Sequence, residues 1–178
     1  ALLQPQEKKE ELNLKNKLSS FTKLIHFPLG RKLIYSKLLN SFNKESLLNP
    51  NNNLINYPSV SFEKMSEIFS NYKLSLNIIE LRNTAILKNP ILKIHLRTFE
   101  IPMSGGLMLT RRSKELENYF EDGKEMVTYS NYDEMIDKSK YFFNCNVKER
   151  DIIKSNARKR SVSDHTWSKR FEPIFKNL

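Results

Sequence analysis

The segment from Arg97 to Thr110 concentrates the residue types that could do chemistry in this chain. It contains an arginine, the carboxylate of Glu100 and two of the four glycines in the sequence, Gly105 and Gly106. Their order predicts a helix that carries polar side chains, a tight turn at which a partner can approach the backbone, and then a buried strand. This arrangement is typical of a phosphosugar or nucleotide site in an α/β domain, although a glycine pair also serves simply to turn the chain.

Apolar periodicity predicts the elements that hold this segment in place. One helix is expected from Arg31 and another from Ser61, whose side chain can cap it. Short strands are predicted over residues 21–27, 74–79, 107–109 and 125–129, and further helices over residues 132–143, 152–162 and 167–175. Strands that alternate with helices imply a mainly parallel α/β sheet that ends in consecutive C-terminal helices. We expect residues 1–20 to be a polar linker or frayed helix, and residues 21–178 to form a single domain.

Two of these elements carry finer expectations. In the strand over residues 74–79, Leu74, Leu76 and Ile78 alternate with their neighbours, which predicts a buried strand. Ser130 begins a capping-box pattern in which Asp133 replaces the usual glutamate, so the next helix is expected to start there. The side chains expected to face inward from that helix are Tyr132, Met135, Ile136, Phe142 and Phe143.

The net charge of the chain is +10 at neutral pH. Basic residues concentrate in residues 8–44 and 148–176, whereas residues 111–147 are net acidic. A basic surface attracts nucleic acid, anionic lipid or phosphorylated ligands. The alternative is that lysine and asparagine merely solvate the helices. The sequence shows no basic cluster interleaved with aromatic residues, so nucleic acid is not favoured as a partner.

Cys145 is the only cysteine, which excludes an internal disulfide framework and a cysteine-based zinc site. Its sequence neighbours Asn144 and Asn146 carry no positive charge that would activate a thiolate, so we expect an inert structural thiol. No apolar run has the length needed to span a bilayer. We therefore expect a cytoplasmic protein, with peripheral association with a membrane as an alternative.

Four blocks of the sequence occur in an order that points to a family. They are residues 61–77, 97–110, 115–125 and 165–170. The second has an Arg-x-Phe-Glu core followed by Gly-Gly, and the fourth reads His-Thr-Trp-x-x-Arg. Together they resemble the C-terminal half of a GT-B glycosyltransferase, specifically the group 1, CgeB-like type. The resemblance runs from about Ser59 to the C-terminus.

This resemblance implies a Rossmann-like domain that binds a nucleoside diphosphate sugar as donor substrate, without a metal and without a cofactor. It implies that Glu100 holds the donor ribose, and a carboxylate can indeed accept hydrogen bonds from two neighbouring hydroxyls. Arg97 lies three positions earlier, on the same helical face, and could neutralise the diphosphate. The expected donor-binding residues are Arg31, Asn77, Arg97, Glu100, Gly105 and Gly106.

Two of these residues are included because of their positions in the predicted elements. Asn77 falls at the carboxyl end of a strand, where open α/β sheets bind ligands. Arg31 lies near a helix N-terminus, where phosphate groups bind. Structural roles remain open for most of the set. Glu100 could be a helix-start charge, Arg97 could pair only with Glu100, and Arg31 could be an exposed helix residue.

The remaining polar residues predict less chemistry. His165 and Trp167 are expected to pack and to cap the last helices. Many group 1 enzymes carry a further glutamate eight positions before the ribose-binding one, and here that position is Leu92. No acid–base pair, metal cluster or nucleophile–base couple is evident, so the catalytic residues are unknown.

We expect the acceptor half, an N-terminal domain or a partner chain, to lie outside this chain, which is therefore incomplete as an enzyme. The alternative function is a non-catalytic basic binding module for nucleic acid or another polyanion on the same fold.

Overall fold

The computed structural model describes residues 22, 25–42, 58–81, 84–85, 87 and 89–176. They belong to two compact units, one with residues 1–55 and 81–91 and the other with residues 56–80 and 92–178. The predicted linker over residues 1–20 lies outside the described residues.

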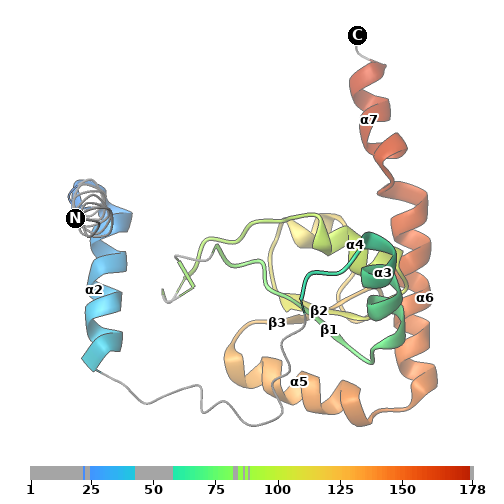
Figure 1. Cartoon of the computed structure of the whole chain (residues 1–178), viewed down its shortest axis with the longest axis horizontal. Coiled ribbons are helices and arrows are strands. Elements are labelled where there is room, and N and C mark those ends of the chain that lie inside the picture. The colour runs from blue at the N-terminus through green and yellow to red at the C-terminus, as the bar shows by residue number, and fades with distance from the viewer. Residues whose placement is uncertain are drawn as a thin grey trace, which may run out of the picture. The chain divides into compact units, whose positions relative to one another are not determined.

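Helix α2, Pro28–Phe42, is the main element of the first unit (Figure 1). The strand predicted over residues 21–27 is wrong, because the described residues there form a helical turn and a bend. The Arg31 amide donates to the Phe27 carbonyl at 3.1 Å, so the helix has already begun before the predicted position. Pro28 is the first helical residue, where its fixed φ favours the helix and its missing N–H costs nothing.

The second unit is built on a parallel three-stranded sheet of order β1-β2-β3. Helix α4 joins β1 to β2, and a short 3₁₀ helix, η1, lies between β2 and β3 (Figure 1). The elements are α3 Phe62–Asn71, β1 Ser75–Asn77, α4 Arg97–Met103, β2 Met108–Arg111, η1 Leu116–Asn118, β3 Val127–Tyr129, α5 Tyr132–Asn144, α6 Val147–Asp164 and α7 Trp167–Phe175. The prediction of a parallel α/β sheet that ends in consecutive helices is confirmed.

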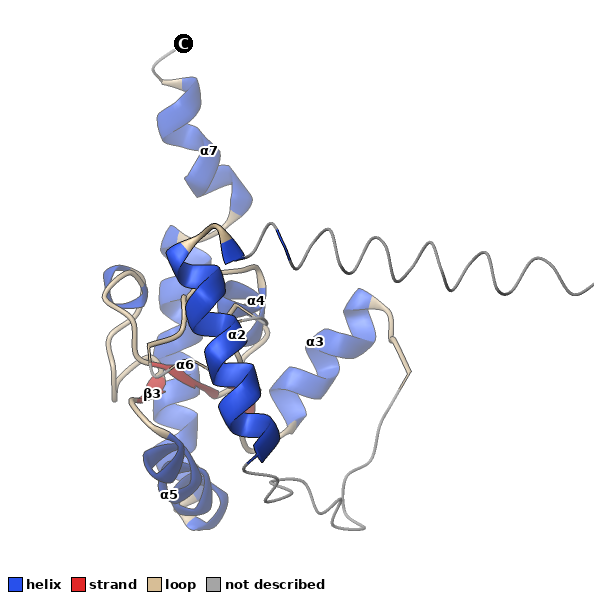
Figure 2. Ribbon diagram, turned by 90° about the vertical axis from the view of Figure 1, so that its left-hand side faces the viewer, coloured by secondary structure: helices blue, strands red, loops and turns tan. Residues whose placement is uncertain are grey.

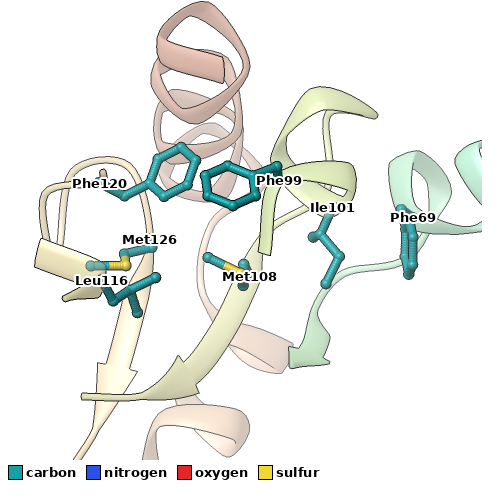
Figure 3. Close-up of a cluster of buried hydrophobic side chains, with 7 residues drawn as sticks. All are labelled: Phe69, Phe99, Ile101, Met108, Leu116, Phe120 and Met126. Atoms are coloured by element: carbon teal, nitrogen blue, oxygen red, sulfur yellow. The ribbon is translucent and has the colours of Figure 1, made fainter. Parts of the chain in front are cut away.

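Helices cover both faces of this sheet, with α4 and α5 on opposite sides (Figures 1 and 2). Side chains of a strand alternate between faces, so Met108 enters one apolar cluster while Leu107 and Leu109 enter the other. The first cluster, shown in Figure 3, contains Phe69, Phe99, Ile101, Met108, Leu116, Phe120 and Met126. The second contains Leu107, Leu109, Val127, Tyr129, Phe142 and Ile153. Burial on both faces is the usual state of a parallel sheet.

Strand β1 is in the predicted place, but the side chains that it buries are not the predicted ones. Leu76 and Ile78 are 48% and 61% exposed, whereas Asn77 and Ile79 are 2% and 1% exposed. Asn77 can enter the interior because its polar groups are satisfied there. Its amide donates to the Thr98 hydroxyl at 3.1 Å, and its carbonyl accepts from a threonine of β2 at 2.9 Å.

Helix caps are predicted correctly at α3 and one residue too early at α5. The Ser61 hydroxyl accepts from the Lys64 amide at 3.3 Å, as expected. At α5 the cap is Asn131, whose side chain accepts from the Glu134 amide at 2.9 Å. The Glu134 carboxylate accepts from the amide of Ser130, the residue before the N-cap, at 2.7 Å, so the contact differs from a capping box, in which it would accept from the N-cap amide.

The inward face of α5 is also narrower than predicted. Phe142 is buried, and Met135 and Ile136 are partly buried. Tyr132 and Phe143 are 64% and 51% exposed, which contradicts their predicted inward position. Tyr132 is the first residue of the helix, and Phe143 is rotated by about 100° from Phe142, which carries it off the face that meets the sheet.

Candidate functional site

The first turn of α4 is tied to the carboxyl end of β1. The Asn77 amide donates to the Thr98 hydroxyl at 3.1 Å and contacts the Met108 sulfur at 3.5 Å. The His95 ring nitrogen Nε2 lies 3.0 Å from the Ile78 carbonyl. Asn77 is thus placed at the predicted strand end, and its side chain anchors the helix that carries Arg97 and Glu100.

Gly105 and Gly106 form the C-terminal turn of α4. The Gly106 amide donates to the Ile101 carbonyl and the Gly105 amide to the Pro102 carbonyl, both at 2.9 Å, which is the Schellman pattern. Gly105 has a φ of 79°, the left-handed conformation that favours glycine. A Cβ on Gly106 would lie 2.9 Å from the Phe69 carbonyl of α3. The pair therefore closes the helix and lets α3 approach closely.

Glu100 and Arg97 have different surroundings although they share α4. Glu100 is partly buried and lines a groove of about 340 Å³. Arg97 is exposed, and its guanidinium lies 5.7 Å from the centroid of the Phe69 ring. Among the ion pairs of the described residues there is none between Arg97 and Glu100. Both side chains thus remain available to a ligand.

Three segments that are far apart in the sequence build this groove: α3, α4 and the joint between α6 and α7. Its lining combines aromatic and aliphatic side chains with one carboxylate and one guanidinium. The lining residues are Phe62, Ser66, Leu96, Phe99, Glu100, Met103, Ser104, His165, Thr166, Trp167 and Arg170.

Arg170 brings positive charge into the groove opposite the first turns of α4. Its guanidinium stacks on Phe99 at 3.7 Å from the ring centroid and lies 5.6 Å from that of Tyr119. Stacking uses the face of the guanidinium and leaves donors at its edge. The sequence prediction did not include this residue, although it closes the terminal His-Thr-Trp-x-x-Arg block and could have been found there.

His165 packs and caps, as predicted. It is the C-cap of α6, and its ring lies 5.3 Å from Phe99 and 5.1 Å from Phe120 between centroids. Its Nε2 atom is 3.1 Å from the Tyr119 carbonyl. The next residue, Thr166, is the N-cap of α7 and accepts from the Lys169 amide at 3.3 Å.

Trp167 is less packed than predicted. It stacks on Phe171 of α7 with ring centroids 5.6 Å apart, but 61% of it is exposed. These two aromatic side chains lie one helical turn apart on α7, and Trp167 also lines the groove. An exposed indole at the edge of a groove can stack on a planar ligand group.

Arg31 belongs to the first unit. It is the fourth residue of α2, and its Nε donates to the Ile25 carbonyl at 2.9 Å. It is exposed, which suits both of the roles considered for it. Its role as a phosphate ligand stays a prediction.

Cys145 has a charged neighbour that its sequence position does not reveal. The Nη1 atom of Arg150 lies 3.6 Å from the sulfur and donates to the carbonyls of Phe142 and Cys145 at 3.0 and 2.8 Å. Arg150 is only 7% exposed. A buried guanidinium that meets several carbonyls fastens the turn between α5 and α6, which gives this region a structural role.

The described residues include no group of three or more histidine, cysteine, aspartate or glutamate side chains that could hold a metal ion. No helix among them is both long and apolar enough to cross a membrane.

A parallel sheet with helices on both faces, followed by consecutive C-terminal helices, defines a Rossmann-like α/β domain, which is consistent with one half of a GT-B fold. A family model described as glycosyl transferase-like matches residues 33–176. The chain therefore belongs to the glycosyl transferase-like family. Comparison with curated proteins and with solved structures finds no significant match. The family match confirms the predicted resemblance to a glycosyltransferase, while the CgeB-like subgroup and the C-terminal half stay predictions.

Proposed function

We propose that this chain binds the nucleoside diphosphate sugar donor of a glycosyltransferase. The observation that carries the proposal is the position of Glu100, in the wall of an aromatic groove within a glycosyl transferase-like domain. The groove volume of about 340 Å³ falls within the range of small-molecule sites, roughly 300–1,000 Å³. It fits the nucleoside part of a donor.

The chemistry of the groove suits a nucleoside. The Glu100 carboxylate can accept from the two hydroxyls of a ribose, which fixes the orientation of that ring. Phe62 of α3 and Trp167 of α7 offer aromatic faces in the lining, and base–aromatic stacking contributes about 1–3 kcal/mol per base. A carboxylate and aromatic faces together recognise a nucleoside better than they recognise a phosphate chain.

We assign the diphosphate to two arginines. Arg97 is exposed in the first turn of α4, and Arg170 lines the groove. A guanidinium binds phosphate oxygens with paired donors and stabilises the charge that develops as the nucleoside diphosphate leaves. Charge stabilisation by arginine is the basis for proposing a transfer that requires no metal.

Catalysis needs groups that we do not assign to this chain. General-base catalysis requires a titratable side chain within hydrogen-bond reach of the acceptor hydroxyl. We propose that this base and the acceptor site belong to a second half, an acceptor domain or partner chain. On this view the described site holds the donor and its leaving group.

The test is a thermal-shift panel on the full chain with UDP, GDP, dTDP and ADP and with sugar derivatives of each. Binding to the folded state raises stability by about 2.7 kcal/mol at a ligand concentration of 100 times Kd. We expect one nucleotide family to raise the melting temperature, and Glu100→Gln to reduce that shift. Glu115→Gln is the matched control, because Glu115 is exposed and outside the groove.

A flat response of the wild-type chain across the panel would contradict the proposal. If wild type and Glu100→Gln show the same shift in melting temperature, the chain binds the nucleotide but Glu100 does not contribute to binding. The same panel repeated with Arg97→Gln and Arg170→Gln asks which guanidinium meets the diphosphate.

A further inference from the structure

Glu80 is a buried carboxylate just beyond the carboxyl end of β1. Its side chain is 9% exposed, and its Oε1 atom lies 3.4 Å from Nη1 of Arg111. The other oxygen, Oε2, is buried and has no hydrogen-bond partner among the described residues. Among the described residues, half of this carboxylate therefore has no hydrogen bond.

The position of Glu80 is fixed by its neighbours. The residue forms an antiparallel bridge with Leu92, and the Lys93 amide donates to the Ile79 carbonyl at 2.8 Å. The paired backbone fixes the direction in which the Glu80 side chain leaves the chain, and the contact with Arg111 holds its carboxylate in a buried position.

As a structural ion pair, Glu80 and Arg111 are poorly arranged. Charge-assisted contacts of this kind are usually about 2.7–2.9 Å long, and a buried acceptor left without a donor is destabilising. The Arg111 side chain is 26% exposed, and its guanidinium carries five N–H donors, more than the contact with Glu80 uses. Both side chains of this ion pair can therefore form a hydrogen bond with a further group.

The pair also lies where the fold binds ligands. Arg111 ends β2 and Tyr129 ends β3, and in open parallel sheets ligands occupy the edge formed by the carboxyl ends of the strands. Burial, and then the charge of Glu80, raise the pKa of Tyr129 to about 12, so its hydroxyl stays protonated beside the carboxylate. A carboxylate, a guanidinium and a phenol therefore meet at this edge.

We propose that Glu80 and Arg111 form the subsite for the sugar that is transferred. A sugar hydroxyl donates one hydrogen bond and accepts others, so it can donate to the Glu80 carboxylate and accept from Arg111. A phosphate cannot serve Glu80, because both groups carry negative charge and neither donates. This proposal rests on the proposed donor function. It assigns the sugar of the donor to Glu80 and Arg111, whereas Glu100 holds the ribose.

The two carboxylates are close enough for one donor. Asn77 contacts Thr98 at 3.1 Å, two residues before Glu100 in α4. Glu80 follows Asn77 by three residues, which span at most about 10 Å. Ribose and sugar of one nucleoside diphosphate sugar are separated by a diphosphate, so a single donor is long enough to reach both carboxylates.

The test compares UDP-glucose, UDP-N-acetylglucosamine, GDP-mannose and dTDP-glucose with their parent nucleoside diphosphates, by calorimetry on the full chain. We expect wild type to bind one sugar nucleotide more tightly than its parent, and Glu80→Gln to lose that difference, by about tenfold or more for a lost hydrogen bond to a charged group. Glu100→Gln should weaken both probes to the same extent. Glu121→Gln, at an exposed glutamate, is the matched control.

Each outcome of this comparison supports or overturns the proposed sugar subsite. If Glu80→Gln binds both probes as wild type does, or weakens both equally, the subsite is overturned while the donor function stands. If no probe binds wild type, the donor function fails and the subsite fails with it. The melting temperature of Glu80→Gln without ligand separates a structural role, which predicts a large loss, from this one, which predicts little loss. If that variant does not fold, Arg111→Lys provides the same comparison with the carboxylate intact.

Discussion

Gly106 illustrates how a residue that suggests a ligand site can be required by packing. An added Cβ would meet the Phe69 carbonyl at 2.9 Å and the Ile101 side chain at 3.0 Å. Because backbone atoms stand on one side, the contact is relieved only by moving α3 or α4. We expect Gly106→Ala to lower the free energy of unfolding by about 1–3 kcal/mol in urea denaturation.

Gly123→Ala shows the opposite case, in which backbone strain acts without a packing clash. Gly123 shares the positive φ of Gly105, at 79°, but an added Cβ there meets nothing within 4 Å. Its loss should come from backbone strain alone, about 1–2 kcal/mol. A Gly106→Ala variant as stable as wild type would show that α3 yields easily and that the glycine is retained for another reason.

Tyr129 should make the folded chain lose stability as the pH becomes alkaline. Its pKa is raised to about 12, first by burial and next by the charge of Glu80. A raised folded-state pKa means that the contribution to stability is complete below the unfolded pKa of about 10 and is lost as the pH rises toward 12. We expect Tyr129→Phe to flatten the fall in unfolding free energy between pH 9.5 and 11.5. Tyr132→Phe, at an exposed tyrosine, should leave the wild-type slope unchanged.

At the residue scale the sequence predicted the location of the site better than its contacts. Glu100 and the glycine pair fall on α4 and its turn, as expected. Arg170 and Glu80 were not predicted, because each reaches the site through a tertiary contact with a segment far away in the chain. Arg170 closes a recognisable sequence block, but its contact with Phe99 is visible only in the structure. The pairing of Glu80 with Arg111 has no local sequence pattern.

At the element scale, the start of α5 depends on one side chain. Asn131 accepts from the Glu134 amide at 2.9 Å and is the N-cap. Replacement of an N-cap asparagine by alanine typically costs about 1 kcal/mol, and replacement by glycine only a few tenths. We expect Asn131→Ala to lower the unfolding free energy by about 1 kcal/mol and Asn131→Gly to lower it much less. Equal losses for the two variants would mean that the side-chain bond does not stabilise the helix.

Elements with a strong local pattern were predictable, and those governed by tertiary contacts were not. The α3 cap and the order helix, glycine turn, buried strand follow from residue types alone. Which side chains of β1 point inward does not follow from residue types. Asn77 is held in the interior by hydrogen bonds with Thr98 and with a threonine of β2, whereas Leu76 stays exposed at the edge of the sheet. Residues 21–27 were misassigned because an apolar run that short fits a helix start as well as a strand.

On the scale of the whole molecule, the charge of +10 does not define the site. A second groove, of about 560 Å³, has four acidic side chains in its wall, together with two arginines. The acidic residues are Glu117, Glu121, Asp122 and Glu125. A polyanion laid across this part of the unit would meet four carboxylates, whereas a small donor in the Glu100 groove would meet one carboxylate and the guanidinium of Arg170.

Ionic strength therefore separates donor binding from the polyanion alternative. A chain that makes 6–10 phosphate contacts with a nucleic acid loses about 10³–10⁵-fold in affinity between 50 and 200 mM salt. A single diphosphate exchanges few counterions, so we expect nucleotide affinity to fall by less than about tenfold over the same range. Fluorescence of Trp167, the only tryptophan, can follow the titration because its indole lines the groove. A steep salt dependence that is insensitive to Glu100→Gln would favour a polyanion module instead, since backbone phosphates have no use for a carboxylate in the groove.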